Sequence, residues 1–155
     1  MKTKQYRQGD VFIERITDLP EGLTKVKSPQ KVILARGEVT GHHHSFDSAV
    51  VDEFCNSEGR QFYRVRGEPF KLSLKVERTW KNQVLVKLPT GGLVEFSKND
   101  VEVENGVARI DGDFAFLDHQ EHTTLGIPAG IYQGGVEGTV RQREYTPQEI
   151  RRVAD

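Results

Sequence analysis

The sequence of 155 residues contains a single cysteine, Cys55, and no apolar run long enough to cross a bilayer. One cysteine excludes an internal disulfide and any zinc site built from cysteines alone. The first residues are charged and lack the apolar segment of a secretion signal. Because no stretch approaches the ~18 apolar residues of a membrane span, we expect a cytoplasmic protein without membrane contact.

An excess of charge of one sign is also missing, since 22 Lys and Arg stand against 23 Asp and Glu. A chain without a global positive field does not coat nucleic acid, so any RNA binding is expected to be weak and local. The P-loop, the dinucleotide-binding glycine pattern and the Gly-x-Ser-x-Gly elbow are absent as well. The sequence therefore indicates neither a nucleotide-binding protein nor a serine hydrolase.

Short apolar runs separated by Gly, Pro, Asn and Asp dominate the chain from Asp10 to about Arg141. They lack the period of an amphipathic helix and predict a mainly β fold, a small barrel or sandwich forming one domain over 1–155. The segment 17–30 is predicted to be a surface loop. The predicted strands are 10–16, 31–36, 49–55, 61–65, 70–77, 83–88, 93–96, 101–104, 107–117 and pieces of 131–141.

Two segments differ from the rest of the chain. Near the C-terminus, Thr146 is a favourable N-cap, Pro147 takes the first helical position and Glu149 completes a capping box, which predicts a short helix over about 147–154. The segment 78–104 resembles part of a small SH3-like or KOW-like barrel, which implies an SH3-like insertion. Two further hairpins of one sheet are the alternative.

All five histidines fall into two short clusters. In the first, His42, His43 and His44 are consecutive. On a strand, His42 and His44 would share one face while His43 points away, which would form half of a metal site. A solvent-exposed loop without ligands is the alternative interpretation.

The second cluster contains His119, Glu121 and His122. His119 and Glu121 share a face if the chain is extended, whereas His119 and His122 converge if it turns after Asp118. Taken alone, the segment is typical of a polar turn whose histidines cap strand ends. Because no histidine lies elsewhere, we expect both clusters to form one site for a divalent transition metal such as Zn, Fe, Mn or Ni. The predicted ligands are His42, His44, His119 and His122.

A glycine-containing turn precedes the His42-x-His44 pair, and Pro128-Ala129-Gly130 follows far downstream. This arrangement is similar to cupin barrels, whose first motif holds an HxH pair with a Glu and whose second holds PxG before a third His. The chain differs in having no Glu shortly after the pair and Gln133 where the third His would lie. The resemblance implies a metal-bearing cupin-like barrel over about 31–55 and 106–140, without implying a reaction.

Four short motifs also resemble those of small uncharacterised bacterial and phage proteins, a resemblance that implies no activity. They are Gln8-Gly9-Asp10-Val11, the stretch 37–44, the stretch 119–122 and Gln142-Arg143-Glu144-Tyr145.

The sequence therefore predicts a metal-binding β-barrel. Hydrolase or lyase chemistry on a small or phosphorylated substrate is the most general outcome, with Glu121 as a replacement ligand or general acid/base. The alternative is a non-catalytic RNA- or protein-binding module whose metal or histidine network is structural. In that alternative Trp80 could stack a base, although a core position is the favoured interpretation. Basic residues available to a partner are Lys75, Arg78, Lys81, Lys87, Arg141, Arg143, Arg151 and Arg152.

Overall fold

The computed structural model describes residues 4–34 and 43–136, and these form β-strands, turns and one 3₁₀ turn, η1 (Lys98–Asp100). The prediction of a mainly β fold is confirmed. The helix predicted over 147–154 and the four C-terminal arginines lie outside the described residues. Within the described part, no helix is long and apolar enough to span a membrane.

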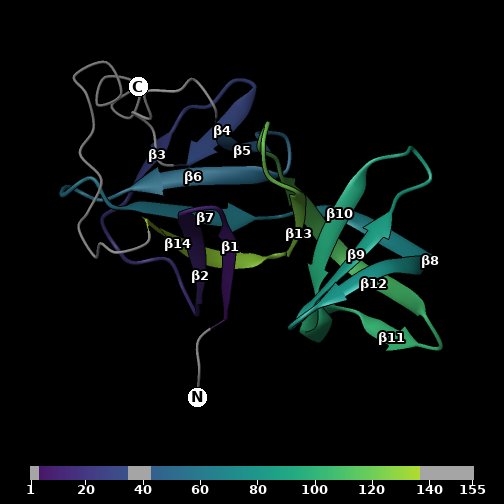
Figure 1. The fold of residues 1–155 in the computed structure, drawn as a ribbon. Coiled ribbons are helices and arrows are strands. Elements are labelled where there is room, and N and C mark those ends of the chain that lie inside the picture. Colours follow the sequence, from purple (N-terminus) through teal and green to yellow (C-terminus); the bar gives the residue numbers. More distant parts are fainter. Residues whose placement is uncertain (1–3, 35–42, 137–155) are drawn as a thin grey trace.

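Two assemblies of strands lie side by side in Figure 1. The first is a six-stranded sheet, with β4 (Lys31–Leu34) and β5 (His44–Asp47) forming a separate antiparallel pair beside it. In spatial order the six strands are β1 (Gln5–Gln8), β2 (Val11–Ile16), β14 (Gly130–Val136), β7 (Gln61–Val65), β6 (Val51–Cys55) and β3 (Thr24–Val26). Every pairing in this sheet is antiparallel.

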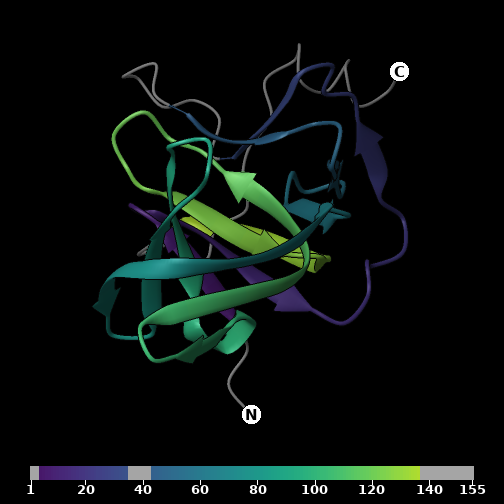
Figure 2. The same ribbon diagram turned by 90° about the vertical axis from the view of Figure 1, so that its right-hand side faces the viewer.

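The second assembly is a barrel, which faces the viewer in Figure 2. Its sheet has the order β11 (Glu102–Glu104), β12 (Val107–Leu117), β13 (Thr124–Pro128), β10 (Leu93–Ser97), β9 (Gln83–Lys87) and β8 (Glu68–Trp80). An additional pairing of β12 with β8 closes five of these strands into a ring. The barrel therefore includes more of the chain than the 78–104 segment. The cupin-like and SH3-like resemblances stay predictions.

Each assembly has its own hydrophobic core, and β12 contributes to both. Ala108, Ile110 and Phe114 are buried in the barrel core, whereas Ala115 and Leu117 are buried in the first core. Successive side chains of a strand point to opposite faces. The neighbours Phe114 and Ala115 can therefore both be buried, because the two faces of β12 lie against different cores.

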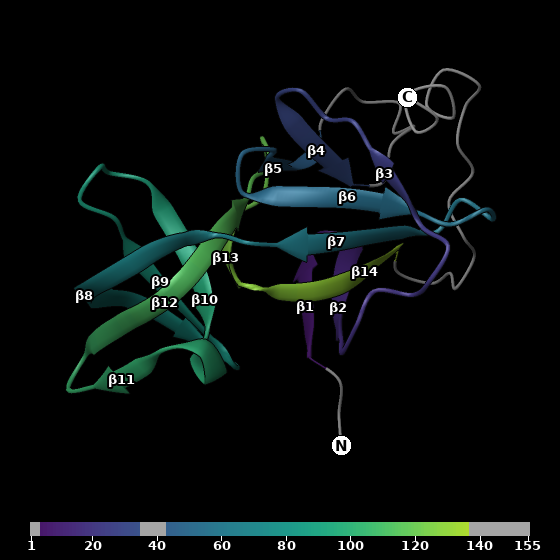
Figure 3. The ribbon, with the colours of Figure 1, turned by 180° about the vertical axis from the view of Figure 1, so that it is seen from behind.

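Two further features connect the assemblies. Figure 3 shows the chain passing directly from β7 into β8. In addition, Tyr6 of β1 donates its hydroxyl to Asp100 Oδ2 at 2.8 Å, and Lys4 Nζ lies 3.0 Å from Asp100 Oδ1. Burial, reinforced by the negative charge of Asp100, raises the pKa of Tyr6 well above its ordinary value. Tyr6 therefore remains a hydrogen-bond donor across this contact.

Four strands were not predicted from the sequence: β1, β3, β5 and β13. The prediction of 17–30 as loop was wrong at Thr24–Val26, which pairs with β6. β1 could not be recognised from the sequence, because only one of its two inward residues, Tyr6 and Gln8, is apolar. The apolar alternation that marks most strands is absent there.

Candidate functional site

The two histidine clusters meet in the structure. His44 begins β5, while His119 and His122 lie in the connection between β12 and β13. The ring centroid of His44 is 4.2 Å from that of His119 and 6.0 Å from that of His122, and His119 and His122 are 4.6 Å apart. Two backbone hydrogen bonds between Ser45 and Asp118, each 2.9 Å long, hold the two segments together. His42 lies outside the described residues.

The turn between β1 and β2 forms a third side of this histidine cluster. Gly9 has a φ of +61°, and a Cβ built on it would lie 2.7 Å from His122 Nε2. Only glycine suits this position, because a side chain would be strained and would displace His122. Asp10 places Oδ1 3.9 Å from His44 Nε2, and its side chain is 67% exposed. Asp10 was missed as a site residue, since only the Gln-Gly-Asp-Val motif drew attention to it.

Gln8 fixes which nitrogen of His44 carries the proton. The Gln8 amide nitrogen donates to the carbonyl oxygens of Leu117 and Thr123 at 2.8 and 3.0 Å. Because carbonyl oxygens only accept, the amide oxygen of Gln8 faces His44 Nδ1, 2.9 Å away. His44 Nδ1 must then be the donor, and His44 Nε2 bears the lone pair on the side of Asp10.

His44 is held in its neutral form. Its side chain is almost fully buried. Burial, followed by the neighbouring ring of His119, lowers the pKa of His44 to about 4, and the nearby Asp10 carboxylate only partly opposes this shift. At neutral pH, His44 is thus an uncharged imidazole, which is the form that binds metal ions.

His119 is oriented differently. Its Nδ1 accepts a hydrogen bond of 3.0 Å from the backbone N–H of Glu121. A neutral His119 therefore carries its proton on Nε2, and neither nitrogen offers a lone pair for a metal in this arrangement. This bond fits the alternative in which the second cluster is a polar turn. Glu121 contributes its backbone here, and the residue is exposed.

In the described part of the chain, no three His, Cys, Asp or Glu side chains are placed so that they could hold a metal ion together. The orientation of His119 gives a physical reason for this result. The donor set nevertheless suits a transition metal, because it combines imidazoles with a carboxylate. His43, by contrast, contacts Gln120 through its backbone N–H rather than through its ring.

The favoured core position for Trp80 was wrong. Trp80 is 63% exposed at the end of β8. The sequence could not reveal this, because β8 contains a register shift between Val76 and Arg78 that changes which residues face outward.

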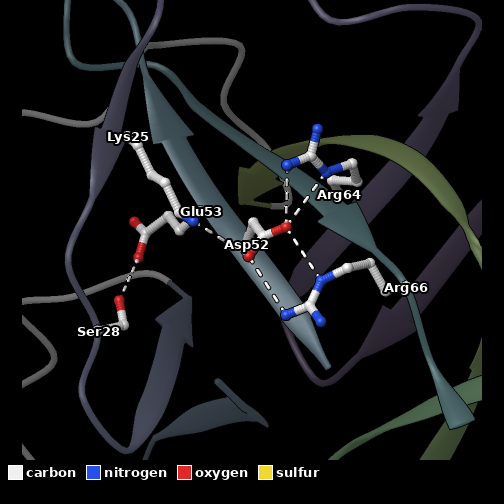
Figure 4. Close-up of polar contacts among 6 residues, drawn as sticks. All are labelled: Lys25, Ser28, Asp52, Glu53, Arg64 and Arg66. Carbon is white, nitrogen blue, oxygen red and sulfur yellow. Dashed lines mark hydrogen bonds and ion pairs between the residues drawn. The ribbon is translucent and has the colours of Figure 1, made fainter. Parts of the chain in front are cut away.

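A second group of charged side chains gathers on β3, β6 and β7 and on Arg66, which directly follows β7 (Figure 4). The carboxylate of Asp52 accepts hydrogen bonds from Nε of Arg64 and Nε of Arg66, each 3.1 Å long, and lies 3.5 Å from Lys25 Nζ. Burial alone would raise the pKa of Asp52, but the bonds from Arg66 and Arg64 outweigh it and lower this pKa. Asp52 thus stays ionised and holds three cations in one place.

A pocket of about 440 Å³ lies beside Asp52. Its lining includes Lys25, Ser28, Ser48 and Glu53, and none of the histidines that the structure describes. Ser48 follows β5, four residues after His44, which corresponds to ~13 Å of extended chain. The pocket is therefore separate from the histidine cluster, and its residues were not predicted as a site.

These features define a β protein in which a closed five-stranded barrel adjoins a second sheet, with an imidazole cluster where they meet. The chain belongs to the family described as domain of unknown function (DUF8820), whose model matches residues 7–135. The matched range includes all five histidines, the barrel core and all of the first core except Tyr6. No curated protein and no solved structure matches the chain.

Proposed function

We propose that the histidine cluster binds one divalent transition metal and serves a hydrolase- or lyase-type reaction on a small or phosphorylated substrate. His44 Nε2 is the fixed ligand in this proposal, with His122 and Asp10 beside it. His42 and His119 remain the other predicted ligands. His119 would join only by giving up its hydrogen bond from the Glu121 N–H.

The observation that carries the proposal is the contact of Gln8 with His44. Metal-binding histidines usually donate their second ring N–H to an oxygen, which fixes the tautomer and the ring orientation. The 2.9 Å contact between His44 Nδ1 and the Gln8 amide oxygen has this arrangement. Gln8 is itself held by two backbone carbonyls. In this proposal, His44 Nε2 therefore has its lone pair and ring orientation fixed before a metal binds.

A metal with an open coordination position lowers the pKa of a bound water and polarises a substrate oxygen. The chain would supply the proton transfer. Asp10 is exposed and 3.9 Å from His44 Nε2, and Glu121 lies in the loop that carries His119 and His122. Either carboxylate could act as the general acid/base next to such a water.

The first experiment measures metal binding to protein purified without a His tag, using Zn²⁺, Mn²⁺, Ni²⁺ and the spectroscopic probe Co²⁺. We expect about one equivalent to bind, and to be lost in His44→Ala and in His122→Ala. His122 is exposed, so its replacement should not impair folding. His43→Ala is the matched control, because its backbone contact survives the change. Equal binding by all three variants would refute the proposal.

The second experiment separates catalysis from binding. Glu121→Gln and Asp10→Asn are assayed against chromogenic phosphate and carboxylic esters, with the metal content of each sample measured in parallel. Loss of an acid/base group should lower turnover by roughly 10²- to 10⁴-fold while the metal stays bound. Loss of metal instead would assign the residue as a ligand.

A structural histidine network is the second candidate, and the bond from Glu121 N–H to His119 Nδ1 favours it. In this case the cluster closes the contact between β5 and the β12–β13 loop without a metal. Removal of His119 would then lower the melting temperature, and no metal would bind to the unmodified protein at micromolar concentrations.

A further inference from the structure

We propose that the tip of the β8–β9 hairpin is a contact site for single-stranded nucleic acid, independent of the metal proposal. Trp80 ends β8 and is the only tryptophan of the chain. It is 63% exposed, the highest value among the exposed large apolar side chains of the described residues. The barrel core is formed without it, so packing does not explain its presence.

The strand register holds Trp80 outward. Trp80 pairs with Gln83, and the adjacent pair joins Thr79 with Val84. Val84 is fully buried and points into the barrel core, so the next pair in the register, Trp80 with Gln83, lies on the outward face. Turning the indole inward would require a slip of one residue, which would expose Val84. The exposure of Trp80 is therefore built into the hairpin.

Three basic residues lie near Trp80 in this part of the barrel, and one of them, Arg78, also acts electrostatically on Glu95 of β10. Lys81 Nζ lies 5.8 Å from the ring centroid of Trp80. Lys98 is placed beside the turn, because its backbone N–H donates to the Asn82 carbonyl at 2.7 Å. Arg78 shares the outward face with Trp80, since it pairs with Leu85. We call Arg78, Trp80, Lys81 and Lys98 the tip patch.

The charge of the barrel is divided along its sequence. Residues 68–92, which contain the β8–β9 hairpin, have five basic and two acidic side chains, a net charge of +3. Residues 93–118 have two basic and seven acidic side chains, a net charge of −5. The hairpin is thus a local positive region on a chain of nearly neutral charge, and it favours an anionic partner.

The turn itself is strained. Lys81 has a φ of 52°, a left-handed conformation that Gly and Asn adopt far more readily than Lys. Lysine at this position gives the turn no advantage, but it places an ammonium group next to the indole. Such local cost is common where a residue serves a ligand rather than the fold.

These features favour single-stranded nucleic acid over other partners. An exposed aromatic ring stacks on bases, and nearby cations contact the phosphates. Gln83 pairs with Trp80 on one side and with Ser97 on the other, so all three residues lie on the outward face. The side chains of Gln83 and Ser97 offer polar groups to base edges. A bilayer would need more apolar area than one indole, and an acidic protein would not need the flat ring.

The experiment uses Trp80 as its own reporter. The full chain is titrated with an oligouridylate of about 12 nucleotides, a length within the usual range for such sites. We expect quenching of the tryptophan emission, with micromolar affinity that weakens as salt rises. Trp80→Ala should reduce affinity by roughly 10- to 100-fold, measured by the fluorescence anisotropy of labelled oligonucleotide.

Two variants separate binding from folding. Lys81→Gly relieves the strained φ and removes a charge. It should therefore raise the melting temperature while lowering the affinity for the oligonucleotide. Arg109→Ala on β12 is the control, because it removes a cation that pairs with Glu102 outside the tip patch. It should leave affinity unchanged.

Several results would overturn the inference. The first is an affinity of Trp80→Ala equal to that of the unmodified protein. The second is quenching by inorganic polyphosphate, which has charge but no bases, equal to that by the oligonucleotide. The third is a loss of affinity in Arg109→Ala equal to that in Trp80→Ala. An emission shift caused by anionic vesicles without oligonucleotide binding would assign the tip patch to a membrane instead. A shift that depends on protein concentration alone would assign it to a second copy of the chain.

Discussion

Gln8→Ala is the change that tests the centre of the histidine cluster most directly. Gln8 is 3% exposed, and its side chain joins β1 to His44 of β5 and to the carbonyl of Leu117 in β12. Truncation to alanine removes all of these hydrogen bonds at once. The backbone of β1 remains paired with β2, because Gln8 and Val11 are bonded through their main chains.

The expected cost follows from the groups left without a partner. His44 Nδ1–H and the Leu117 carbonyl are buried, and each costs about 1–3 kcal/mol when it loses its hydrogen bond. Thr123 is exposed, so water can replace the bond to its carbonyl. Water entering the space left by the side chain would reduce the total. We therefore expect a loss of ~2–4 kcal/mol in the free energy of unfolding.

Urea denaturation of metal-free protein measures this loss, and Gln5→Ala is the matched control. Gln5 lies in the same strand, but it is exposed, and its side chain bonds to Glu14 at the surface. Its replacement should change stability by no more than ~0.5 kcal/mol. Gln8→Ala should also weaken metal binding by roughly 10- to 100-fold, if Gln8 orients the ligand. Equal stability of the two variants would refute the reasoning about buried partners.

Three further results are expected. The pKa of His44 is about 4 in the folded state and ~6.5 in the unfolded chain. The free energy of unfolding of metal-free protein should therefore fall by ~1.4 kcal/mol per pH unit from pH 6.5 down to 4. Urea midpoints that stay constant over this range would contradict this prediction. Gly9→Ala should lower the free energy of unfolding by ~2 kcal/mol, because φ is positive at this position. It should also move the His122 ring resonances in NMR spectra, because the added Cβ would collide with this ring. Unmoved resonances would argue against the contact. Asp52→Asn should lower stability by ~1 kcal/mol at neutral pH. It should also reduce the loss of stability below about pH 4, because the pKa of Asp52 is lowered in the folded state. Unchanged acid sensitivity would assign this loss to other carboxylates, such as Glu14, whose pKa is also lowered.

Much of the fold follows from local patterns in the sequence. Gln61–Val65 and Val107–Leu117 were predicted with the bounds that the structure has, because turn residues flank both runs. Asn105 and Gly106 both have positive φ, as a two-residue hairpin turn requires. The β1 and β3 strands carry too few apolar residues to be recognised, since they owe their form to pairing partners distant in the sequence.

The candidate site was predictable only in part, for a similar reason. Two histidine clusters in one chain indicated that His44, His119 and His122 meet, and the structure brings these three rings together. Spacing could not reveal the tautomer of His44 or the bond that occupies His119, because both depend on Gln8 and on a local turn. Composition likewise gave no sign of the Asp52 network, whose members come from three strands and from the segment after β7.

The sharing of β12 between two cores determines how the protein unfolds. Phe114 and Phe116 of this strand pack in the barrel core, whereas the alternating residues Ala115 and Leu117 pack in the first core. If the barrel opened, Ala115 and Leu117 of β12 would lose their packing in the first core as well. The two assemblies should therefore melt in one cooperative transition, and a fragment containing only the barrel strands would expose Ala115, Leu117 and Ile127 to water. We therefore expect the two cores to unfold as one thermodynamic unit, although each has its own set of buried side chains.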